Sequence, residues 1–549
     1  MAIDLPPIIP PQLSSAEKIE AHASRGSETI NTEVSGFTLR VTGNRYLTEE
    51  QIRQIAGAAK TPSQAIRAIN QAYYQSGHLL VTIYYAQRGE VIYAHVVNGK
   101  LAGVEGDQSL TSHFTPLVGD ENLTVAEFER RRVLADIQAN RSGQKYQISY
   151  KAGSEPDAMT LVFNQADVED YDPTEWGLSL GNQGNRFVGR YFAGASVTHQ
   201  FWNGTELDVN YESAMTEWGE TNGGRSYDGL LLTLDKPTRF GLYGVELSHA
   251  RYERDDVVIN PGQEDTSLLC TVFGFCSDAP ATNEPVVVEG ETSSAALTGE
   301  QVLYATPRQR LTVSERLDYT KADIELDDGR ILQEEAHAAA ELGLKYFRYS
   351  DWFGKPVRWS VQGFVEKGLS TDDGTFSLDN NANNVSAGKR TAEYLLYRPK
   401  MGVKVGLTDK WSVTLDVLSQ LSDGEQLPQQ KQFVLGGMST LSAYLPGTLI
   451  GDTGTYVRVK LERNGWEAFG MEFTPALFAE YGQAQFENVD GELGDTRSLS
   501  DAGLSIEGEL GWDITMQFVA AAPLSDRNIG EDALEDLEVD FYWKLSKTF

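Results

Sequence analysis

The feature that most constrains the fold is a two-residue alternation of apolar and polar side chains, which begins near Tyr171 and continues to the last residue. In 411–417 and again in 457–462 the odd-numbered residues are apolar and the even-numbered ones are polar. Turn clusters such as 327–329 and longer polar loops separate such segments. Successive side chains of a strand point to opposite faces, so each segment has one apolar and one polar face. The pattern predicts a transmembrane β-barrel, with a soluble β-sandwich as the alternative.

The composition also favours a barrel. The 549 residues include 52 Gly, 24 Tyr, 22 Phe and 9 Trp, while only 40% are apolar, which suits many half-exposed strands better than several compact cores. No stretch approaches the ~18 to 20 apolar residues of a membrane-spanning helix. The barrel would take 169–549. At about 24 residues for each strand with its connection, this length predicts an all-β membrane barrel of about sixteen antiparallel strands.

The end of the chain agrees with this interpretation. Six apolar residues share one face of the predicted last strand, interrupted only by Lys547: Leu537, Val539, Phe541, Trp543, Leu545 and Phe549. A final strand that ends on an aromatic residue resembles the recognition signal of bacterial outer-membrane barrels, which Phe541, Trp543 and Phe549 would carry. The resemblance implies the bacterial outer membrane, contact with the lipid bilayer and contact with the barrel-assembly machinery during biogenesis.

The first 168 residues have a different pattern of apolar and polar side chains. A proline-rich start and a short polar helix over 14–23 form a predicted leader, 1–33, which we expect to be mobile and able to plug the barrel or leave it. The segment 1–11 has neither the basic start nor the apolar stretch of a signal peptide, which indicates a mature or engineered start.

Two successive βααββ units follow the leader. In 34–102, Thr48 and Gln51 form a capping box, Thr61 caps a second helix that ends at Gly77, and strands are predicted at 78–85 and 91–97. In 103–168 the pattern repeats. The second unit has a strand at Val104, a helix that Thr124 and Glu127 cap, and paired strands at 146–150 and 159–163.

Two such units resemble POTRA domains, which are α+β. The segment 128–163 is similar to the second POTRA domain of two-partner secretion transporters of the haemolysin and haemagglutinin type, and 73–79 resembles a step in their first. The hairpin 178–190 and the strand 518–524 resemble parts of the family's barrel. This resemblance implies two periplasmic POTRA domains, a sixteen-stranded barrel, and transport of one large secreted partner protein to the cell surface.

The most informative stretch resembles the lid loop that enters the barrel from outside in this superfamily. Its residues are the turn Gly436-Gly437, the tip Leu441-Ser442-Ala443-Tyr444, and Gly451-Asp452. The family tip is Val-Arg-Gly-Tyr. This chain keeps the aromatic residue but has serine in place of the arginine and alanine in place of the glycine.

The family's lid arginine binds an acidic residue in a Phe-x-Asp-x-Gly pattern of the barrel wall, and Phe478-Ala-Glu480-Tyr-Gly482 resembles that pattern. The two-residue period predicts that Glu480 faces the lumen. Ser442 could offer only one neutral hydrogen bond. Glu480 must therefore lie in water, be protonated or bind another cation, either Lys431 or an arginine of a neighbouring strand. In a wide lumen we expect water or the cation rather than protonation. Alternatively, the loop folds inward only for structural reasons.

Other residue types restrict the remaining functions. The net charge of −33 argues against nucleic-acid binding. Cys270 and Cys276 are expected to form an extracellular disulfide. Gly177-Leu-Ser179-Leu-Gly181 fits Gly-x-Ser-x-Gly, but a strand rather than a helix follows it, so we predict no catalytic residues and no enzyme. The seven histidines are scattered singly, so no metal and no cofactor are expected. We expect a monomer.

The resemblance implies that POTRA sheets capture an extended secretion signal by strand addition, while the lid and the leader clear the lumen. Two rival functions are a barrel-assembly insertase of the same superfamily and a passive pore. Insertases usually carry more POTRA domains and keep the lid arginine. A passive pore would fit the lost arginine but leaves the two POTRA units unexplained.

Overall fold

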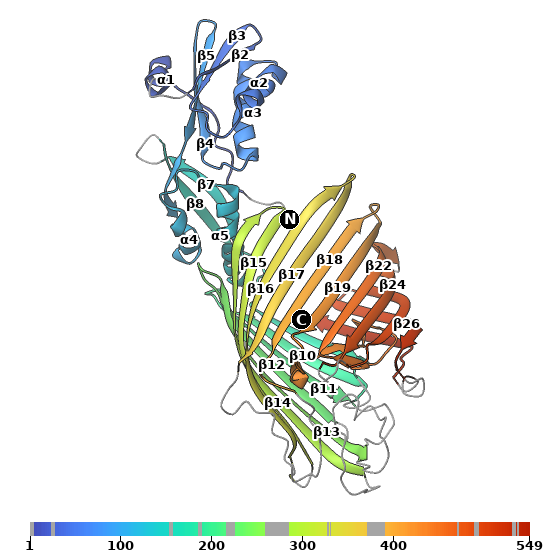
Figure 1. The fold of residues 1–549 in the computed structure, drawn as a ribbon. Helices are drawn as coiled ribbons and strands as arrows, with labels where there is room; N and C mark the ends of the chain where they lie inside the picture. Colours follow the sequence, from blue (N-terminus) through green and yellow to red (C-terminus); the bar gives the residue numbers. More distant parts are fainter. Residues whose placement is uncertain are drawn as a thin grey trace.

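The computed structural model describes residues 5–23, 28–152, 157–184, 189–215, 226–258, 285–326, 329, 331–369, 390–468, 471–487, 494–529, 534 and 537–549. Two small α+β units stand at one end of a closed β-barrel (Figure 1). Among the helices in these ranges, none has the length and apolar character needed to cross a membrane. Cys270 and Cys276 lie outside the described residues, so their disulfide stays a prediction.

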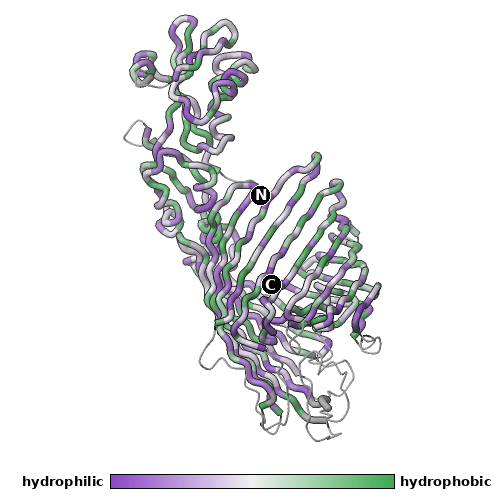
Figure 2. Tube along the Cα trace, in the orientation of Figure 1, coloured by the Kyte–Doolittle hydropathy of each residue, from purple (hydrophilic) through white to green (hydrophobic). Residues whose placement is uncertain are grey.

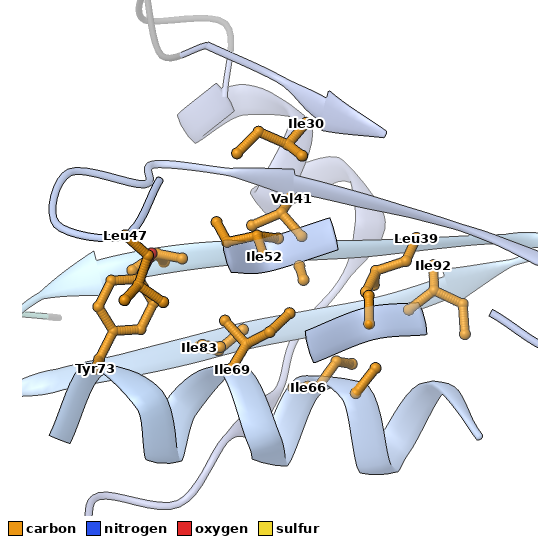
Figure 3. Packing of buried hydrophobic residues seen from close by; sticks show 14 of the residues in the cluster. Ile30, Leu39, Val41, Leu47, Ile52, Ile66, Ile69, Tyr73, Ile83 and Ile92 are labelled. Atoms are coloured by element: carbon orange, nitrogen blue, oxygen red, sulfur yellow. The ribbon is translucent and has the colours of Figure 1, made fainter. Parts of the chain in front are cut away.

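The first unit is a five-stranded sheet in the order β1-β4-β5-β3-β2, packed against two helices. Its elements are β1 (Gln12–Leu13), α1 (Ala16–Ala23), β2 (Ile30–Val34), β3 (Phe37–Thr42), α2 (Glu49–Ala58), α3 (Pro62–Gln75), β4 (Val81–Arg88) and β5 (Val91–Asn98). Thr48 and Gln51 form the predicted capping box, and Thr61 caps α3 with Pro62 at its first turn. Isoleucine side chains of α2 and α3, together with Tyr73 of α3, pack against the sheet (Figure 3).

The predicted helix of the leader is present, and it lies on the first sheet. α1 packs against β4 and β5 with Ile19 buried, and β1 pairs with β4 in parallel. The described part of the leader therefore lies outside the barrel. β2, which the predicted boundaries divided between leader and first unit, belongs wholly to the first sheet.

The second unit has a three-stranded sheet in the order β6-β8-β7. Its elements are β6 (Lys100–Glu105), α4 (Gln108–Phe114), η1 (Thr115–Leu117), α5 (Val125–Arg141), β7 (Gln144–Ala152) and β8 (Ala158–Asp167). Thr124 and Glu127 form the predicted capping box of α5. Because β6 belongs to this sheet, the division between the units falls at Gly99 and not after residue 102.

The remainder closes into a barrel of sixteen antiparallel strands, as predicted, with β27 paired to β9. β22 and β23 form one interrupted strand, since both pair with β24. The strands are β9 (Thr174–Gly181), β10 (Tyr191–Gln200), β11 (Glu206–Met215), β12 (Ser226–Pro237), β13 (Leu242–Val258), β14 (Pro285–Thr306), β15 (Gln309–Leu326), β16 (Ile331–Trp352), β17 (Lys355–Leu369), β18 (Leu395–Gly406), β19 (Trp411–Ser422), β22 (Thr453–Arg463), β23 (Trp466–Ala468), β24 (Met471–Gln485), β25 (Arg497–Glu509), β26 (Ile514–Arg527) and β27 (Phe541–Thr548).

The alternation of the sequence becomes an apolar outer face and a polar inner face. On β24, Leu477 and Tyr481 are 61% and 43% exposed, whereas the intervening Phe478 and Glu480 are buried. Figure 2 shows hydrophobic and hydrophilic residues alternating along the strands. This arrangement is that of a transmembrane barrel and excludes the soluble sandwich, whose apolar faces would be covered.

Short turns and long connections lie at opposite ends of the barrel. α5 of the second unit contacts the end with short turns, where Arg131 donates to the carbonyl of Arg239 at 2.9 Å. There Arg141 also forms ion pairs with Glu206 and Asp235 on two neighbouring strands. Barrels of this class keep short turns on the periplasmic side, so the α+β units lie on that side.

One prediction about the end of the chain is wrong. Leu537 and Val539 precede the last strand and are buried against the connection between β19 and β22, instead of continuing its outer face. Phe541 and Phe549 are 42% and 60% exposed, and the amide of Phe549 donates to the carbonyl of Trp176 at 2.8 Å. The role of Phe541, Trp543 and Phe549 as a signal stays a prediction.

Candidate functional site: the lid segment and its wall contacts

Residues 427–452, which we call the lid segment, lie in the connection between β19 and β22. They contain η2 (Gln429–Lys431), β20 (Phe433–Leu435) and β21 (Leu449–Gly451), and the two short strands pair with each other. Gly436 and Gly437 both have positive φ angles, of 114° and 97°. A Cβ atom at Gly436 would lie 2.1 Å from the carbonyl oxygen of Leu445, so this turn requires glycine.

The tip of the lid segment is bound by two carboxylates through backbone amides. The N–H of Ser442 donates to Glu480 Oε2 at 2.7 Å, and the N–H of Ala443 donates to Asp501 Oδ2 at 2.9 Å. The serine side chain, which could have offered Glu480 one neutral hydrogen bond, instead donates to the carbonyl of Met438 at 3.4 Å. The clamp therefore uses donors that any non-proline residue would supply.

Glu480 has recruited another cation, one of the alternatives open from the sequence. It is 3% exposed, and Arg458 Nε lies 3.4 Å from its Oε1. Arg458 stands directly opposite Glu480 in the register of β22 and β24. Tyr456 also donates a hydrogen bond to Glu480. Because Glu480 is buried, the alternative in which water solvates it is wrong.

Further contacts hold the tip against the last strand. Tyr444 is buried, and its carbonyl accepts a hydrogen bond from the hydroxyl of Tyr542 at 2.7 Å. Two backbone hydrogen bonds join the tip to the segment before β27, one from Leu445 to Leu537 and one from Val539 to Ala443. These bonds explain why the residues before β27 turn inward.

Gly482, the last residue of the predicted wall pattern, leaves room for the lid segment. A Cβ atom there would lie 2.6 Å from Leu435 Cδ1 and 2.9 Å from Leu441 Cδ1. Both leucines are fully buried. Phe478 packs in a buried apolar cluster with Leu445 of the lid segment. The three pattern residues 478, 480 and 482 therefore all contact or adjoin the lid segment.

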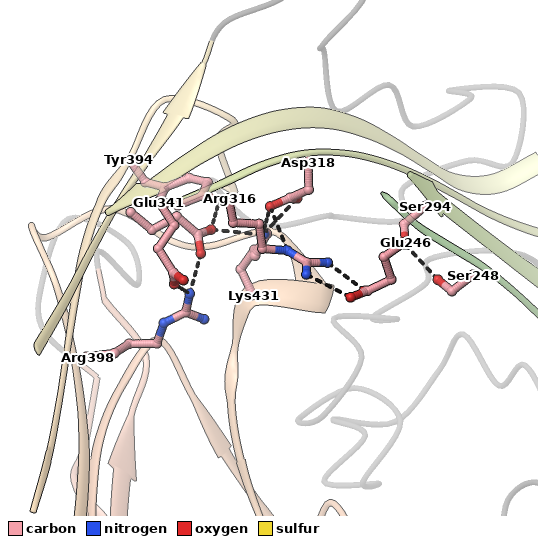
Figure 4. Close-up of polar contacts among 10 residues, drawn as sticks. Glu246, Ser248, Ser294, Arg316, Asp318, Glu341, Tyr394, Arg398 and Lys431 are labelled. Atoms are coloured by element: carbon pink, nitrogen blue, oxygen red, sulfur yellow. Dashed lines mark hydrogen bonds and ion pairs between the residues drawn. The ribbon is translucent and has the colours of Figure 1, made fainter. Parts of the chain in front are cut away.

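The other end of the lid segment is held by a charged network on a separate part of the wall. Lys431 Nζ lies 3.0 Å from Asp318 on β15 and 2.9 Å from Glu366 on β17. Figure 4 shows Lys431 directed toward Asp318, with Arg316, Glu341 and Arg398 completing the network. Lys431 is therefore not the cation that binds Glu480. The amide of Gln429 adds a bond to Glu335 at 3.1 Å.

Asp452 fixes the point where the lid segment returns to the barrel. Its two carboxylate oxygens accept the amides of Leu427 and Glu487, both at 2.9 Å. Gly451 passes so close to Gln485 that a Cβ atom would lie 2.5 Å from its carbonyl oxygen. The lid segment thus bridges β15–β17 and β24–β27 inside the barrel.

Two other sequence motifs lie away from this arrangement. Ser179 is within strand β9, which leads to β10, so the turn from strand to helix that a nucleophile elbow requires is absent at this position. Within the described ranges, no cluster of three or more histidine, cysteine or acidic side chains could hold a metal ion.

Sequence reasoning missed several wall residues. Asp501 and Tyr542 lie in segments for which we predicted no lid contact, and nothing in their local sequence marks them. Arg458 could have been found, because the alternation of 457–462 already placed it on the polar face of a strand.

Comparison with known proteins adds the family. Residues 276–507 match the family model of haemolysin secretion/activation protein ShlB/FhaC/HecB. The matched residues lie within the barrel, so the barrel is similar to that of this secretion family. This match, together with a barrel that is joined to two POTRA units, supports outer-membrane transport in two-partner secretion. No curated protein sequence matches the chain.

Solved structures agree on the fold. CdiB from Escherichia coli has a TM-score of 0.67 and 14% identity, with 95% of this chain and 91% of that chain covered. CdiB from Acinetobacter baumannii has a TM-score of 0.61 at 14% identity and the same coverage of both chains. BamA from Haemophilus ducreyi lacking POTRA domains 1–3 has a TM-score of 0.50 and 13% identity, with 94% and 100% covered.

Proposed function

We propose that this transporter carries one large partner exoprotein, that its POTRA sheets bind the partner in extended form, and that the lid segment gates the lumen. The observation that carries the gating proposal is the pair of bonds from Ser442 and Ala443 to Glu480 and Asp501. Both donors are backbone amides, so the tip can leave the wall and return without a change of side chains. An extended partner suits the POTRA sheets, because strand addition accepts many sequences.

The test uses secretion from intact cells. A large, repeat-rich exported protein encoded in a neighbouring reading frame is the expected partner, and it should reach the medium only when this transporter is present. Removing residues 100–168, the second unit, should abolish its release while the barrel still assembles. Release of the partner without the transporter would refute the proposal.

A barrel-assembly insertase is the second candidate. The seam between β27 and β9 favours it, because the pairing there spans only Lys544–Thr548, whereas β10 and β11 pair over their full lengths. An insertase would lower the amounts of other outer-membrane barrels when it is depleted. Unchanged barrels together with lost secretion of one partner would decide for transport.

A further inference from the structure

The outer edge of β4 in the first POTRA unit is occupied by the chain's own leader. Gln12 and Leu13 pair with Tyr84 and Tyr85 in parallel, and the amide of Ser14 donates to the carbonyl of Tyr85 at 2.9 Å. In the described part of the chain this two-residue strand is the only partner of that edge, although β4 extends over Val81–Arg88. The leader thus uses a small part of the pairing that the edge offers.

Three side chains extend this edge into a track for an extended chain. Tyr74 donates to the carbonyl of Pro6 at 2.8 Å, Asn70 to that of Ile9 at 2.7 Å, and Thr82 to that of Pro10 at 3.1 Å. All three are donors that meet backbone carbonyls. This suits a leader with prolines at 6, 7, 10 and 11, because proline has a carbonyl but no N–H.

The leader leaves one polar group of this track unused. Asn70 is 2% exposed, and its Oδ1 has no hydrogen-bond partner in the described part of the chain. A buried acceptor without a donor is costly. The leader residues that follow Ile9 cannot satisfy it, since Pro10 and Pro11 lack an N–H. A segment with ordinary residues there would bring a donor.

The track leads toward the barrel. Ile9 is buried in the core of the second POTRA unit, and Leu5 lies at a cavity of about 790 Å³ between the two units and the short turns of the barrel. Thr124 and Gly77 line the cavity on the POTRA side, and Arg308 and Tyr349 line it on the barrel side. An extended chain that follows the leader's path therefore arrives at the periplasmic rim.

We propose that the outer edge of β4, with Tyr74, Asn70 and Thr82, is where an extended segment of the transported protein docks. At rest, residues 5–14 occupy this site as an internal competitor. The partial strand pairing and the unused Asn70 acceptor make the leader a replaceable occupant, which a segment with a full set of backbone N–H groups displaces. This inference rests on the proposed function and adds the site and its regulation.

The first experiment uses a fluorescein-labelled synthetic peptide with the sequence of residues 5–14 and the full chain in lipid nanodiscs. A variant that lacks residues 1–14 should bind the peptide saturably, and the parent should bind it at least about tenfold more weakly, because the tethered leader competes at high effective concentration. A matched peptide with Ile9→Asp should not bind, since it would bury a carboxylate.

Substitutions keep the test independent of the deletion. The Ile9→Asp chain has its full length, but its leader should leave the same edge. It should therefore also bind the labelled parent peptide. Asn70→Leu in the deletion background should weaken binding of the peptide about tenfold, because a buried hydrogen bond between uncharged groups is lost. Glu33→Ala, on the exposed opposite edge of the sheet, is the matched control and should leave binding unchanged. Absence of peptide binding to both freed chains overturns the inference.

The second experiment asks whether the partner uses the same site. The unlabelled exoprotein found by the secretion test, kept unfolded in mild urea, should displace the labelled peptide from the deletion variant. Displacement supports the inference. If the peptide binds but the exoprotein does not displace it, the edge serves only the leader and the inference fails, while secretion of the exoprotein still upholds the proposed function.

Discussion

At the scale of single residues, the lid tip shows how a lost arginine is replaced. Arg458 comes from the wall itself and stays beside Glu480 whether or not the lid is seated, because the two residues face each other across paired strands. In this chain the cation therefore belongs to the wall, and the lid contributes only backbone amides. We therefore expect substitutions at Glu480 and Ser442 to affect the seated lid differently from the same substitutions in a chain whose lid supplies the arginine.

Glu480→Gln should loosen the lid. The substitution leaves Arg458 without its carboxylate and weakens the bond from the Ser442 amide, at a cost of about 1–3 kcal/mol. We expect more frequent openings in planar bilayers and disturbed secretion. Glu507→Gln makes the same change of charge at a half-exposed position on β25 and should leave both unchanged. Equal effects of the two variants would contradict a specific clamp.

Ser442→Arg should destabilise the seated lid. The serine is fully buried and Arg458 already serves Glu480, so a new guanidinium meets an occupied site. Overpacking of this kind typically costs about 1–3 kcal/mol. The expected result is a higher open probability in bilayers. A quieter channel with a raised melting temperature would show that Glu480 prefers the lid cation to Arg458.

Gly482→Ala tests the fit between wall and lid without a change of charge. The added methyl group would meet the side chains of Leu435 and Leu441 at less than 3 Å, so the lid must shift, at a cost of about 1–3 kcal/mol. Conductance should rise. Gly363→Ala on β17 is the matched control, because nothing lies within 4 Å of its added carbon. A silent Gly482→Ala would show that the lid does not rest there.

At the scale of elements, α5 joins the second POTRA unit to the barrel and contains a buried acid. Burial raises the pKa of Glu129 to about 7 and outweighs the opposing effect of Arg132, 2.9 Å away. Nearby on α4, burial and the charge of Arg131 lower the pKa of His113 to about 4. The two groups affect stability in opposite directions as the pH changes.

The sign for each group follows from proton linkage. The folded state keeps a proton on Glu129 that the unfolded chain has lost between pH 4.5 and about 7, so this group lowers stability as the pH rises through that window. His113 has a folded pKa of about 4 against an ordinary 6.5, so it raises stability as the pH rises between these values. Above about pH 7 neither contribution changes further.

Glu129→Gln should therefore stabilise α5 above pH 7 and change little at pH 5. The expected gain at pH 8 is at most about 3 kcal/mol, at about 1.4 kcal/mol for each tenfold change in proton affinity. Hydrogen–deuterium exchange of the α5 amides in the full chain measures it. A difference between variant and parent that is the same at pH 5 and pH 8 would refute the assignment.

Much of this architecture could be predicted because regular elements leave local marks in the sequence. The period of two gave the barrel, and the threonine caps gave the helix starts. The clamp could not be predicted in the same way, because its donors at 442 and 443 are backbone amides, which carry no residue identity. Leu537 and Val539 were misplaced because an apolar residue that faces lipid and one that packs under a lid look alike in sequence.

At the scale of the whole molecule, the leader and the lid segment occupy different compartments. The leader lies on the first POTRA sheet, and the lid segment lies within the barrel. Of these two described segments, only the lid segment lies within the barrel, and the leader is placed to act on the periplasmic side. This division separates recognition of the partner from opening of the lumen.

Deleting residues 1–23 should therefore leave ion conductance unchanged. The deletion removes β1 and α1 from the edge and face of the first sheet, and none of the described residues that it removes, 5–23, lies in the lumen. Planar bilayer recordings of the deletion variant and the parent, at equal protein density, provide the measurement. A clear rise in conductance would place the helix in the barrel during the recording and contradict its position on the sheet.

The attachment of the lid segment at two separate parts of the wall makes closure redundant. If only the ion pair of Lys431 is lost, the tip bonds hold the segment within reach, and the freed end rebinds at a high local concentration. The same holds for loss of the tip alone. Only simultaneous loss of both attachments allows an opening that lasts. A polypeptide that passes through the barrel needs an open lumen until its whole length has crossed. Loss of one attachment therefore permits brief leakage of ions, whereas transport of a protein requires the release of both.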